Sequence, residues 1–330
     1  MSRVFLLQFQ QPEQSWRKLL VLLATKVQKR MSILVDEKTK VLVQGATGKE
    51  GQRAISQMRS YGTEVLVGVT PGKGGQEVEG VPVFNTVEEA INKFPAVNTS
   101  FVTVPKQAAK DAIIESAAHK IPLINVLTEH MPIADTAYAL AFANDAGVRI
   151  VGPSSIGIIS PGKGKLGSIG GDNPDFSFVR GDIGVISKSG GMSSEVSYIL
   201  KKAGFGQSTV IGIGGDMIVG STFADLLLEF EKDEETAAVV MFGEVGGTYE
   251  EEAAETIKSK KFTKPAVAFI SGVFAEMMPT GTALGHAGAI IEADKGRRID
   301  KIKSLEAAGV KIAAVPDDFP AVLKKLIKKG

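Results

Sequence analysis

The sequence predicts an α/β protein in which two doubly wound domains with parallel sheets follow each other. Three observations carry this prediction. The chain has 330 residues, and at about 150 residues per domain this length favours two domains. Short apolar runs rich in β-branched residues alternate with helical patterns, which is typical of βαβ units. Many of the 37 glycines follow directly on such apolar runs, as they do in turns at the ends of parallel strands.

The first half of the chain begins its alternation with a strand at Lys40–Gln44. Thr86 is the expected N-cap of a helix that runs to Lys93, because a Thr hydroxyl can accept a hydrogen bond from a free N–H of the first turn. Gly147 is expected to end a helix as its C′ residue. The other strands are expected at 64–69, 99–104, 121–127 and 148–151, and the other helices at 52–61, 106–119 and 136–146.

The alternation stops from Pro153 to Asp182, a segment rich in Gly, Pro, Ser and Asp. We interpret it as a long linker with residues 161–180 at its centre, between a domain over 31–160 and a second domain over 181–330. The second domain is expected to have strands at 183–187, 209–213, 237–242, 266–270 and 311–315, and helices near 192–203, 221–231, 249–259 and 300–308.

The composition excludes several classes of protein. Lys and Arg number 38 against 37 Asp and Glu, and this net charge of +1 argues against a strongly basic nucleic-acid binder. The absence of Cys excludes disulfides, thiolate catalysis and Cys-ligated metals. With three His in the chain we also expect no multi-His metal site. No stretch reaches the ~20 apolar residues that a membrane span needs.

Residues 1–30 differ in composition from the rest of the chain, with several Lys and Arg and a single acid, Glu13. This fits either a mitochondrial-type presequence or an extra stretch upstream of a domain that starts at Met31. We favour the second interpretation, in which residues 1–30 are an N-terminal extension without a motif. The expected compartment is the cytoplasm, with the mitochondrial matrix as the alternative.

A glycine-rich turn, Gly45-Ala-Thr-Gly-Lys-Glu-Gly51, directly follows the first strand. Glycines let a backbone approach a phosphate, and the N-terminus of the following helix favours an anion. An NAD-binding domain would place an acid after the second strand to hold the ribose hydroxyls, but the glycine-rich turn there carries Lys73. A cation suits a ribose phosphate, in NADP or in the 3′-phosphate of coenzyme A. A structural turn with a solvated lysine is the alternative.

His286 lies in a loop of very small residues, Gly285-His-Ala-Gly-Ala289. Small neighbours leave room for a phosphate on the imidazole and let the loop move, although a single His is often only structural. The sequence contains no GxxxxGK[ST] phosphate-binding loop. A phosphate that reaches His286 would therefore come from a site on another polypeptide.

Three strand-to-glycine turns stand in the second half of the chain, at 187–191, 212–216 and 243–247. At the carboxyl ends of parallel strands such turns bind ligands. Ser189, Gly190 and Gly191 begin a helix, so their N–H groups are expected to bind a substrate carboxylate or a phosphate. Glu244 could accept from one imidazole nitrogen and leave the other free as a nucleophile. Each turn by itself could equally be a tight loop and nothing more.

From Met31 onward the chain resembles the alpha subunit of succinyl-CoA synthetase and the matching part of ATP-citrate lyase and citryl-CoA synthetase. The motifs that carry the resemblance are VTPGKGG at 69–75, GFGQS at 204–208, GEVGG at 243–247 and GHAGA at 285–289. The resemblance implies a Rossmann-like CoA-binding domain followed by a flavodoxin-like ligase domain. It also implies an enzyme, an acid–thiol ligase that joins an acid to CoA at the expense of a nucleotide.

The resemblance further implies roles for single residues. His286 matches the phosphorylated histidine of the family, and Glu244 matches the carboxylate that pairs with it. The positions implied to contact CoA are Gly45, Thr47, Gly48, Lys49, Glu50, Lys73, Leu127, Thr128 and Glu129. The nucleotide, ATP or GTP with Mg²⁺, is implied to bind in a beta-type subunit with an ATP-grasp fold. The expected assembly is therefore a hetero-oligomer without nucleic acid or membrane.

Departures within the family favour one substrate. Succinate enzymes typically have Ser-Gly-Thr where this chain has Ser-Gly-Gly191, and a tyrosine where it has Ser194; citrate enzymes resemble Ser-Gly-Gly-Met-Ser, as here. The segment 271–284 is also longer than in succinate enzymes. Smaller residues leave room for a tricarboxylate, so we expect the small subunit of citryl-CoA synthetase. Because no lyase domain follows Gly330, such an enzyme would release citryl-CoA. The succinyl-CoA synthetase alpha subunit and, from another class, an NADP-binding oxidoreductase are the alternatives.

Overall fold

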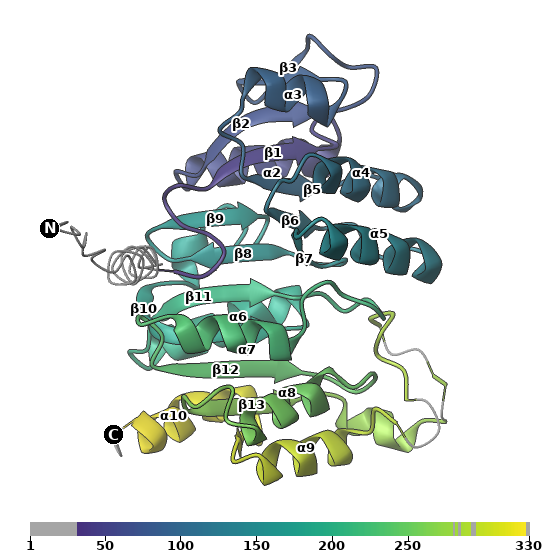
Figure 1. Cartoon of the computed structure of the whole chain (residues 1–330). Helices are drawn as coiled ribbons and strands as arrows, with labels where there is room; N and C mark the ends of the chain where they lie inside the picture. The colour runs from purple at the N-terminus through teal and green to yellow at the C-terminus, as the bar shows by residue number, and fades with distance from the viewer. Residues whose placement is uncertain (1–31, 280, 283–284, 292–294, 328–330) are drawn as a thin grey trace, which may run out of the picture. The chain divides into compact units, whose positions relative to one another are not determined.

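The computed structural model describes residues 32–279, 281–282, 285–291 and 295–327 (Figure 1). The expected N-terminal extension, residues 1–30, lies outside the described residues. From Ser32 onward the chain forms one compact unit, and the strands of its described part form two sheets of seven strands each. Both sheets are mostly parallel, which confirms the predicted α/β class.

The strands of the first sheet are β1 (Lys40–Gln44), β2 (Glu64–Val69), β3 (Glu77–Val78), β4 (Val81–Phe84), β5 (Thr99–Val102), β6 (Leu123–Val126) and β7 (Arg149–Val151). Their order across the sheet is β3-β4-β2-β1-β5-β6-β7. Only the β3–β4 pair is antiparallel. Because β1 lies between β2 and β5, the order of the strands reverses there, and ligands of such sheets bind at that point. The β3–β4 hairpin was not predicted, since β3 has only two residues and Pro82 interrupts the pattern of β4.

The helices of the first half are α2 (Lys49–Ser60), α3 (Val87–Lys93), α4 (Lys106–Ala118) and α5 (Ile133–Asp145). The predicted cap of α3 is confirmed, because the Thr86 hydroxyl accepts from the Glu89 N–H at 3.1 Å. Gly147 has φ +74° just beyond α5, as a C′ glycine requires. Figure 1 shows α4 and α5 side by side along β5 to β7.

The strands of the second sheet are β8 (Gly157–Ser160), β9 (Gly164–Gly167), β10 (Arg180–Ser187), β11 (Gln207–Gly212), β12 (Ala238–Gly243), β13 (Ala266–Ile270) and β14 (Lys311–Ile312). Their order is β14-β13-β12-β10-β11-β8-β9. The pairs from β14 to β11 are parallel, whereas β8 is antiparallel to both β11 and β9. The order of the strands reverses at β10, which lies between β11 and β12.

The prediction of a linker at 161–180 is wrong, because β9 and a 3₁₀ turn at Pro174–Phe176 lie within it and β8 lies just before it. Every residue of β8 and β9 is buried. Glycines hide these strands in the sequence. Gly157 has φ +128°, and a Cβ there would lie 2.0 Å from the Leu166 carbonyl oxygen. The close approach of the two backbones therefore requires a residue that weakens a strand pattern.

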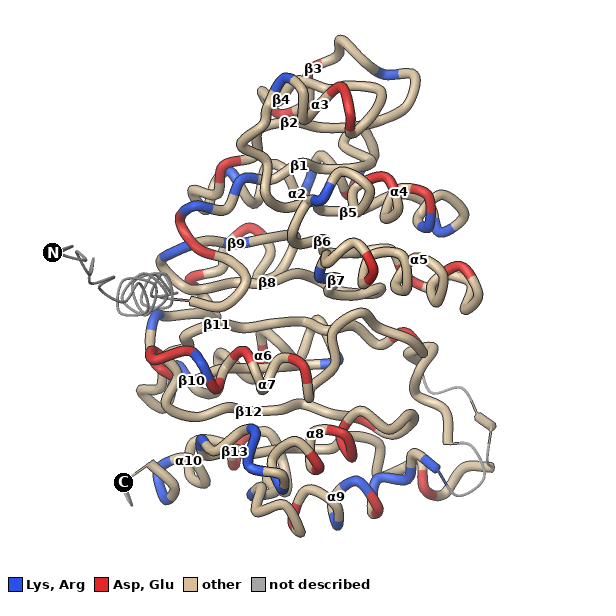
Figure 2. The backbone as a smooth tube through the Cα atoms, viewed as in Figure 1, with Lys and Arg blue, Asp and Glu red and all other residues tan. Residues whose placement is uncertain are grey.

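The helices of the second half are α6 (Gly190–Lys202), α7 (Phe223–Lys232), α8 (Tyr249–Lys258), α9 (Arg298–Ala307) and α10 (Phe319–Ile327). The sequence predicted all of them except α10. Among the described residues no helix is long and apolar enough to cross a membrane. Figure 2 shows Lys and Arg interspersed with Asp and Glu along the helices of both halves, as the near-neutral net charge leads one to expect.

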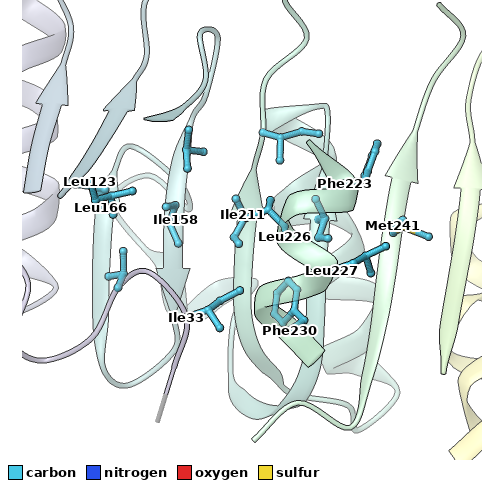
Figure 3. Packing of buried hydrophobic residues seen from close by; sticks show 14 of the residues in the cluster. Ile33, Leu123, Ile158, Leu166, Ile211, Phe223, Leu226, Leu227, Phe230 and Met241 are labelled. Atoms are coloured by element: carbon cyan, nitrogen blue, oxygen red, sulfur yellow. The ribbon is translucent and has the colours of Figure 1, made fainter. Parts of the chain in front are cut away.

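One hydrophobic cluster runs through both sheets (Figure 3). It includes Leu123 of β6, Ile158 of β8, Ile211 of β11 and Phe230 of α7, all at most 5% exposed. Fully burying a side chain of this size stabilises a fold by about 1.5–3 kcal/mol. The shared cluster therefore ties the two sheets into the single unit that positions the site described next.

Candidate active site

Three loops meet at the carboxyl ends of β10, β11 and β12, where a doubly wound sheet binds its ligands. Ser189 caps α6, since its hydroxyl accepts from the Met192 N–H at 3.4 Å. The first-turn N–H groups of α6, from Gly190 and Gly191, have no acceptor within their own helix. Together with the positive end of the helix dipole they form a place for an anion.

His286 and Glu244 meet in this region although they lie on separate loops. The imidazole Nδ1 lies 2.9 Å from the Glu244 carboxylate oxygen Oε2. Glu244 is 10% exposed and His286 35% exposed, so the ring remains accessible while its partner is enclosed. The hydrogen bond to Glu244 raises the pKa of His286, and burial of the ring opposes this shift. An Nδ1–H held by a carboxylate leaves Nε2 as the nucleophilic nitrogen.

Glycines shape the pocket around the imidazole. A Cβ at Gly215 would lie 2.3 Å from His286 Cγ, so any side chain at this position would displace the ring. The Gly215 carbonyl also accepts the N–H of Gly288 at 2.8 Å. A Cβ at Gly246 would lie 2.0 Å from the Gly288 oxygen. The loops after β11 and β12 therefore clamp the His286 loop through backbone contacts that only glycine allows.

A cavity of about 560 Å³ adjoins His286. Its lining brings together residues from both halves of the chain: Arg53, Leu127, Glu129, Ser154, Ile156, Ser168, Gly170, Gly171, Asn173, Phe176, Ser177, Ser189, Gly190, Gly191, Ser194 and His286. The histidine and the start of α6 therefore face the same space. The buried hydroxyl of Ser168 has no hydrogen-bond partner among the described residues. The cavity is large enough for a small organic acid and polar enough to hold it.

A second cavity of about 470 Å³ lies where the strand order of the first sheet reverses. Gly45 lines it together with Val69 and Val104, which lie at or just beyond the carboxyl ends of β2 and β5. The position corresponds to the crevice that holds nucleotides in such sheets. Its walls are mainly apolar, as a ring system requires.

The structure places the other expected CoA residues in three groups. Leu127 and Glu129 line the cavity of His286. The Thr128 hydroxyl donates to the carbonyl of Val104 at 2.7 Å. Because Val104 lines the second cavity, this bond holds the segment 127–129 next to that cavity. Lys73 is exposed in the turn after β2. The remaining residues lie in the turn before α2 or in its first turn: Thr47, Gly48, Lys49 and Glu50.

Asp216 is a site residue that the sequence did not reveal. It is 8% exposed, and its carboxylate accepts the N–H groups of His130 and Met131 at 3.3 and 3.4 Å. Burial raises the pKa of Asp216, and these two hydrogen bonds oppose the shift. Asp216 thus joins the loop beneath His286 to the segment that follows Glu129. In the sequence it was only the last residue of a glycine turn. Among the described residues no group of three His, Asp or Glu side chains could hold a metal ion.

Comparisons with known proteins agree with this arrangement. Residues 36–130 match the CoA binding domain family, and residues 186–315 match the CoA-ligase family. The succinate–CoA ligase [ADP-forming] subunit alpha of Staphylococcus aureus (strain N315) is 45% identical over 300 residues, 91% of this chain and 96% of that protein. The chain belongs to the CoA-ligase family of the succinate–CoA ligase alpha subunits. The alpha subunit of Aquifex aeolicus (strain VF5) is 46% identical over 300 residues, 90% of this chain and 95% of its own.

Two solved structures share the fold. ATP citrate lyase of Methanosaeta concilii superposes with a TM-score of 0.83 at 24% identity, over 90% of this chain. This chain spans only 51% of that one. An acetyl-coenzyme A synthetase of Ca. Korarchaeum cryptofilum superposes with a TM-score of 0.65 at 18% identity, over 85% of this chain and 59% of that one. The predicted family, the CoA-binding domain followed by a ligase domain, and the acid–thiol ligase class are confirmed.

Proposed function

We propose that this chain is the alpha-type subunit of an acid–CoA ligase that works through a phosphohistidine at His286. The geometry of one residue carries the proposal. Nδ1 of His286 lies 2.9 Å from Glu244 Oε2, while the same ring lines a cavity with the start of α6. A carboxylate on Nδ1 orients the ring and leaves Nε2 free to attack phosphorus. The helix N-terminus beside it suits the phosphate or carboxylate that must meet the ring.

The proposed reaction has three transfers. Nε2 of neutral His286 attacks the γ-phosphorus of a nucleotide, and the nucleoside diphosphate leaves with the electrons of the broken P–O bond. A carboxylate oxygen of the acid then attacks the phosphorus, which forms an acyl phosphate and returns the imidazole to its neutral state. The CoA thiolate finally attacks the acyl carbon, and inorganic phosphate leaves. The carboxylate thereby gains the leaving group that it lacks by itself.

The two cavities suggest how CoA lies on the chain. Its nucleotide end fits the 470 Å³ cavity beside Gly45. The exposed Lys73 follows β2, whose last residue lines this cavity, and its ammonium group would pair with the ribose phosphate. The thiol end would then pass Leu127 and Glu129 into the 560 Å³ cavity of His286. ATP or GTP with Mg²⁺ would bind in a beta-type subunit, and the two subunits would form a hetero-oligomer. We place the enzyme in the cytoplasm, with the mitochondrial matrix as the alternative.

Succinate is the acid that the relatives favour. Proteins 44–46% identical over most of this chain are named as succinate–CoA ligase alpha subunits. The sequence motifs alone favoured citrate, with succinate as the alternative. The comparisons therefore support that alternative better than the first interpretation.

Citrate stays a second candidate because of one observation. A Cβ built on Gly191 meets nothing within 4 Å, and Ser194 lines the same cavity. The space beside the start of α6 is thus empty where a larger residue would reduce it. A tricarboxylate needs such space, whereas succinate does not.

A substrate panel tests both candidates. The full chain would be co-expressed with its beta-type subunit, supplied with CoA and ATP or GTP, and assayed for succinyl-CoA and citryl-CoA. His286→Asn should lose the acid-labile phosphate taken up from the nucleotide and still bind CoA. Label that persists on this variant would contradict the role of His286. An NADP-binding oxidoreductase would take up no phosphate at all.

A further inference from the structure

A cluster of buried charges lies behind the loop that carries Glu244, outside the cavity lining. We call it the lysine–glutamate cluster, and it consists of Lys188, Glu250 and Lys301. Lys188 Nζ lies 3.2 Å from Glu250 Oε1, and Lys301 Nζ lies 2.6 Å from Glu250 Oε2. The three side chains are 5%, 3% and 0% exposed. Figure 2 shows the acidic positions of α8 beside the basic positions of α9.

The lysine–glutamate cluster holds the Glu244 loop at both ends. Glu250 Oε1 accepts the backbone N–H of Glu244 at 3.1 Å. Lys301 Nζ donates to the carbonyl of Gly247 at 2.9 Å. A Cβ at Gly243 would lie 2.6 Å from Glu250 Oε1, so the carboxylate packs directly against the start of this loop. The Glu250 side chain therefore fixes the position of the backbone at Gly243 and Glu244.

The same cluster reaches the start of α6. Lys188 directly precedes the helix cap Ser189, and its backbone N–H donates to the Phe242 carbonyl at 3.1 Å. Its ammonium group ends on Glu250, which belongs to α8. A single carboxylate thus connects the expected anion site of α6 with the loop of Glu244.

Because the lysine–glutamate cluster is buried, each of its charges needs the others to compensate it. Burial opposes the charged form of Glu250, but Lys188 and Lys301 outweigh it and leave its pKa below the usual value. The pKa of Lys301 is raised for the matching reason, because Glu250 and Glu251 outweigh the effect of its burial. A buried ion that loses its partner is strongly unfavourable. The cluster therefore stays ionised and holds one geometry.

Glu244 depends on this backbone support because its own side chain makes few hydrogen bonds. Its Oε2 meets His286 at 2.9 Å, whereas its buried Oε1 has no hydrogen-bond partner among the described residues. In the described part of the chain no hydrogen bond to Oε1 fixes the direction of the carboxylate. Its aim at the imidazole is consequently set by the backbone that Glu250 and Lys301 hold.

We propose that Glu250, fixed by Lys188 and Lys301, is a positioning residue that aims Glu244 at Nδ1 of His286. The inference rests on the proposed function of His286 as the phosphorylated residue. Glu250 is not among the residues that line the cavity, and its link to His286 in the described part of the chain runs through the backbone N–H of Glu244. Mutation of residues that orient metal-bound imidazoles typically changes metal affinity or activity by about 10- to 100-fold, and we expect an effect of the same order for a residue that positions the partner of His286.

Two neighbouring substitutions provide a matched test in the complex of the full chain with its beta-type subunit. Glu250→Gln removes the charge that anchors Lys188 and Lys301. Glu251→Gln removes another carboxylate of the same helix turn, which lies 2.9 Å from Lys301 Nζ but is 28% exposed. We expect Glu250→Gln to slow single-turnover phosphorylation of His286 by about 10- to 100-fold, with the affinity for CoA unchanged. Glu251→Gln should stay within about twofold, because Glu250 still compensates the buried Lys301 and still accepts the Glu244 N–H.

A second measurement separates this inference from the proposed function. Histidine-labelled chain gives few side-chain NMR signals, because the sequence has three His, and His286→Asn assigns the relevant one. The Nδ1 proton of His286 should lose its hydrogen-bonded shift in Glu250→Gln and keep it in Glu251→Gln, whether or not the enzyme takes up phosphate. If Glu250→Gln does not fold, Glu250→Asp replaces it, because the shorter chain keeps the charge and loses the reach to the Glu244 N–H. A Glu250 variant with the wild-type rate and the wild-type His286 signal would overturn the inference, as would an equal loss in Glu251→Gln.

Discussion

In the proposed reaction His286 depends on a single carboxylate, that of Glu244. Glu244 lies 2.9 Å from Nδ1 and raises the pKa of the imidazole. The partner orients the ring and fixes its tautomer, but it also keeps the ring protonated to a higher pH than a free imidazole. A protonated Nε2 cannot attack phosphorus. The pairing therefore orients the ring but lowers the fraction of His286 that is neutral near pH 7. This effect should be visible in the pH dependence of the phosphorylation rate.

We predict that the rate of His286 phosphorylation rises with pH through the raised pKa of this residue. Glu244→Gln should move the rising limb to lower pH, toward the ordinary value of about 6.5, and lower the maximal rate because the ring is less well oriented. The raised pKa also means that the pair stabilises the fold below the unfolded-state pKa and loses this contribution as pH rises through the folded-state value. Single-turnover rates across pH measure the first effect, and equal midpoints for wild type and variant would contradict it.

Gly191 allows a sharp test of substrate size. Because a Cβ at this position meets nothing within 4 Å, Gly191→Thr should leave the fold intact and place its bulk in the cavity. Overpacking of a fitted site costs about 1–3 kcal/mol, which corresponds to a roughly 5- to 150-fold loss of citrate turnover. Succinate turnover and phosphorylation of His286 should both survive. A loss of phosphorylation in this variant would show that Gly191 serves the histidine rather than the acid.

At the scale of elements, the caps and turns of the helices position the site more than their lengths do. The start of α6 contributes its N–H groups because Ser189, two residues after the end of β10, caps the helix. α7 begins with a capping box, in which the Thr222 hydroxyl accepts from the Asp225 N–H at 3.3 Å and the Asp225 carboxylate accepts from the Thr222 N–H at 2.9 Å. The N-cap residue of α8, Thr248, makes no such side-chain bond.

This contrast gives a stability prediction with an internal control. Thr222→Ala should lower the free energy of unfolding by about 1 kcal/mol, since it removes the cap of α7. Thr248→Ala should cost clearly less, because its side chain does not cap α8 and donates instead to the exposed side chain of Glu252. Denaturant unfolding of the full chain compares the two. Equal losses would mean that the capping box contributes nothing beyond the removed side-chain atoms.

At the scale of the whole molecule, the residues proposed for the site extend from Gly45 to His286, and the match to the CoA binding domain begins at residue 36. We therefore predict that a chain beginning at Met31 binds the beta-type subunit, takes up phosphate and turns over like the full chain. Size-exclusion chromatography of the co-expressed subunits and the acyl-CoA assay check this. Failure to assemble would show instead that residues 1–30 belong to the subunit interface.

The sequence by itself determined the α/β class, the order of most elements and the turns that carry the chemistry. It could do so because periodicity, caps such as Thr86 and glycine clusters are local signals that no distant contact overrides. The resemblance to the family also pointed to the pairing of His286 with Glu244.

Only the tertiary structure decided the rest. β8 and β9 were hidden, since glycines such as Gly157 serve a backbone approach that the sequence does not show. Asp216 and Glu250 carried no motif, because their roles come from buried contacts with His130 and with Lys301, far away along the chain. The role of a buried charge depends on the partner that compensates it. That partner is brought next to it only when the chain folds.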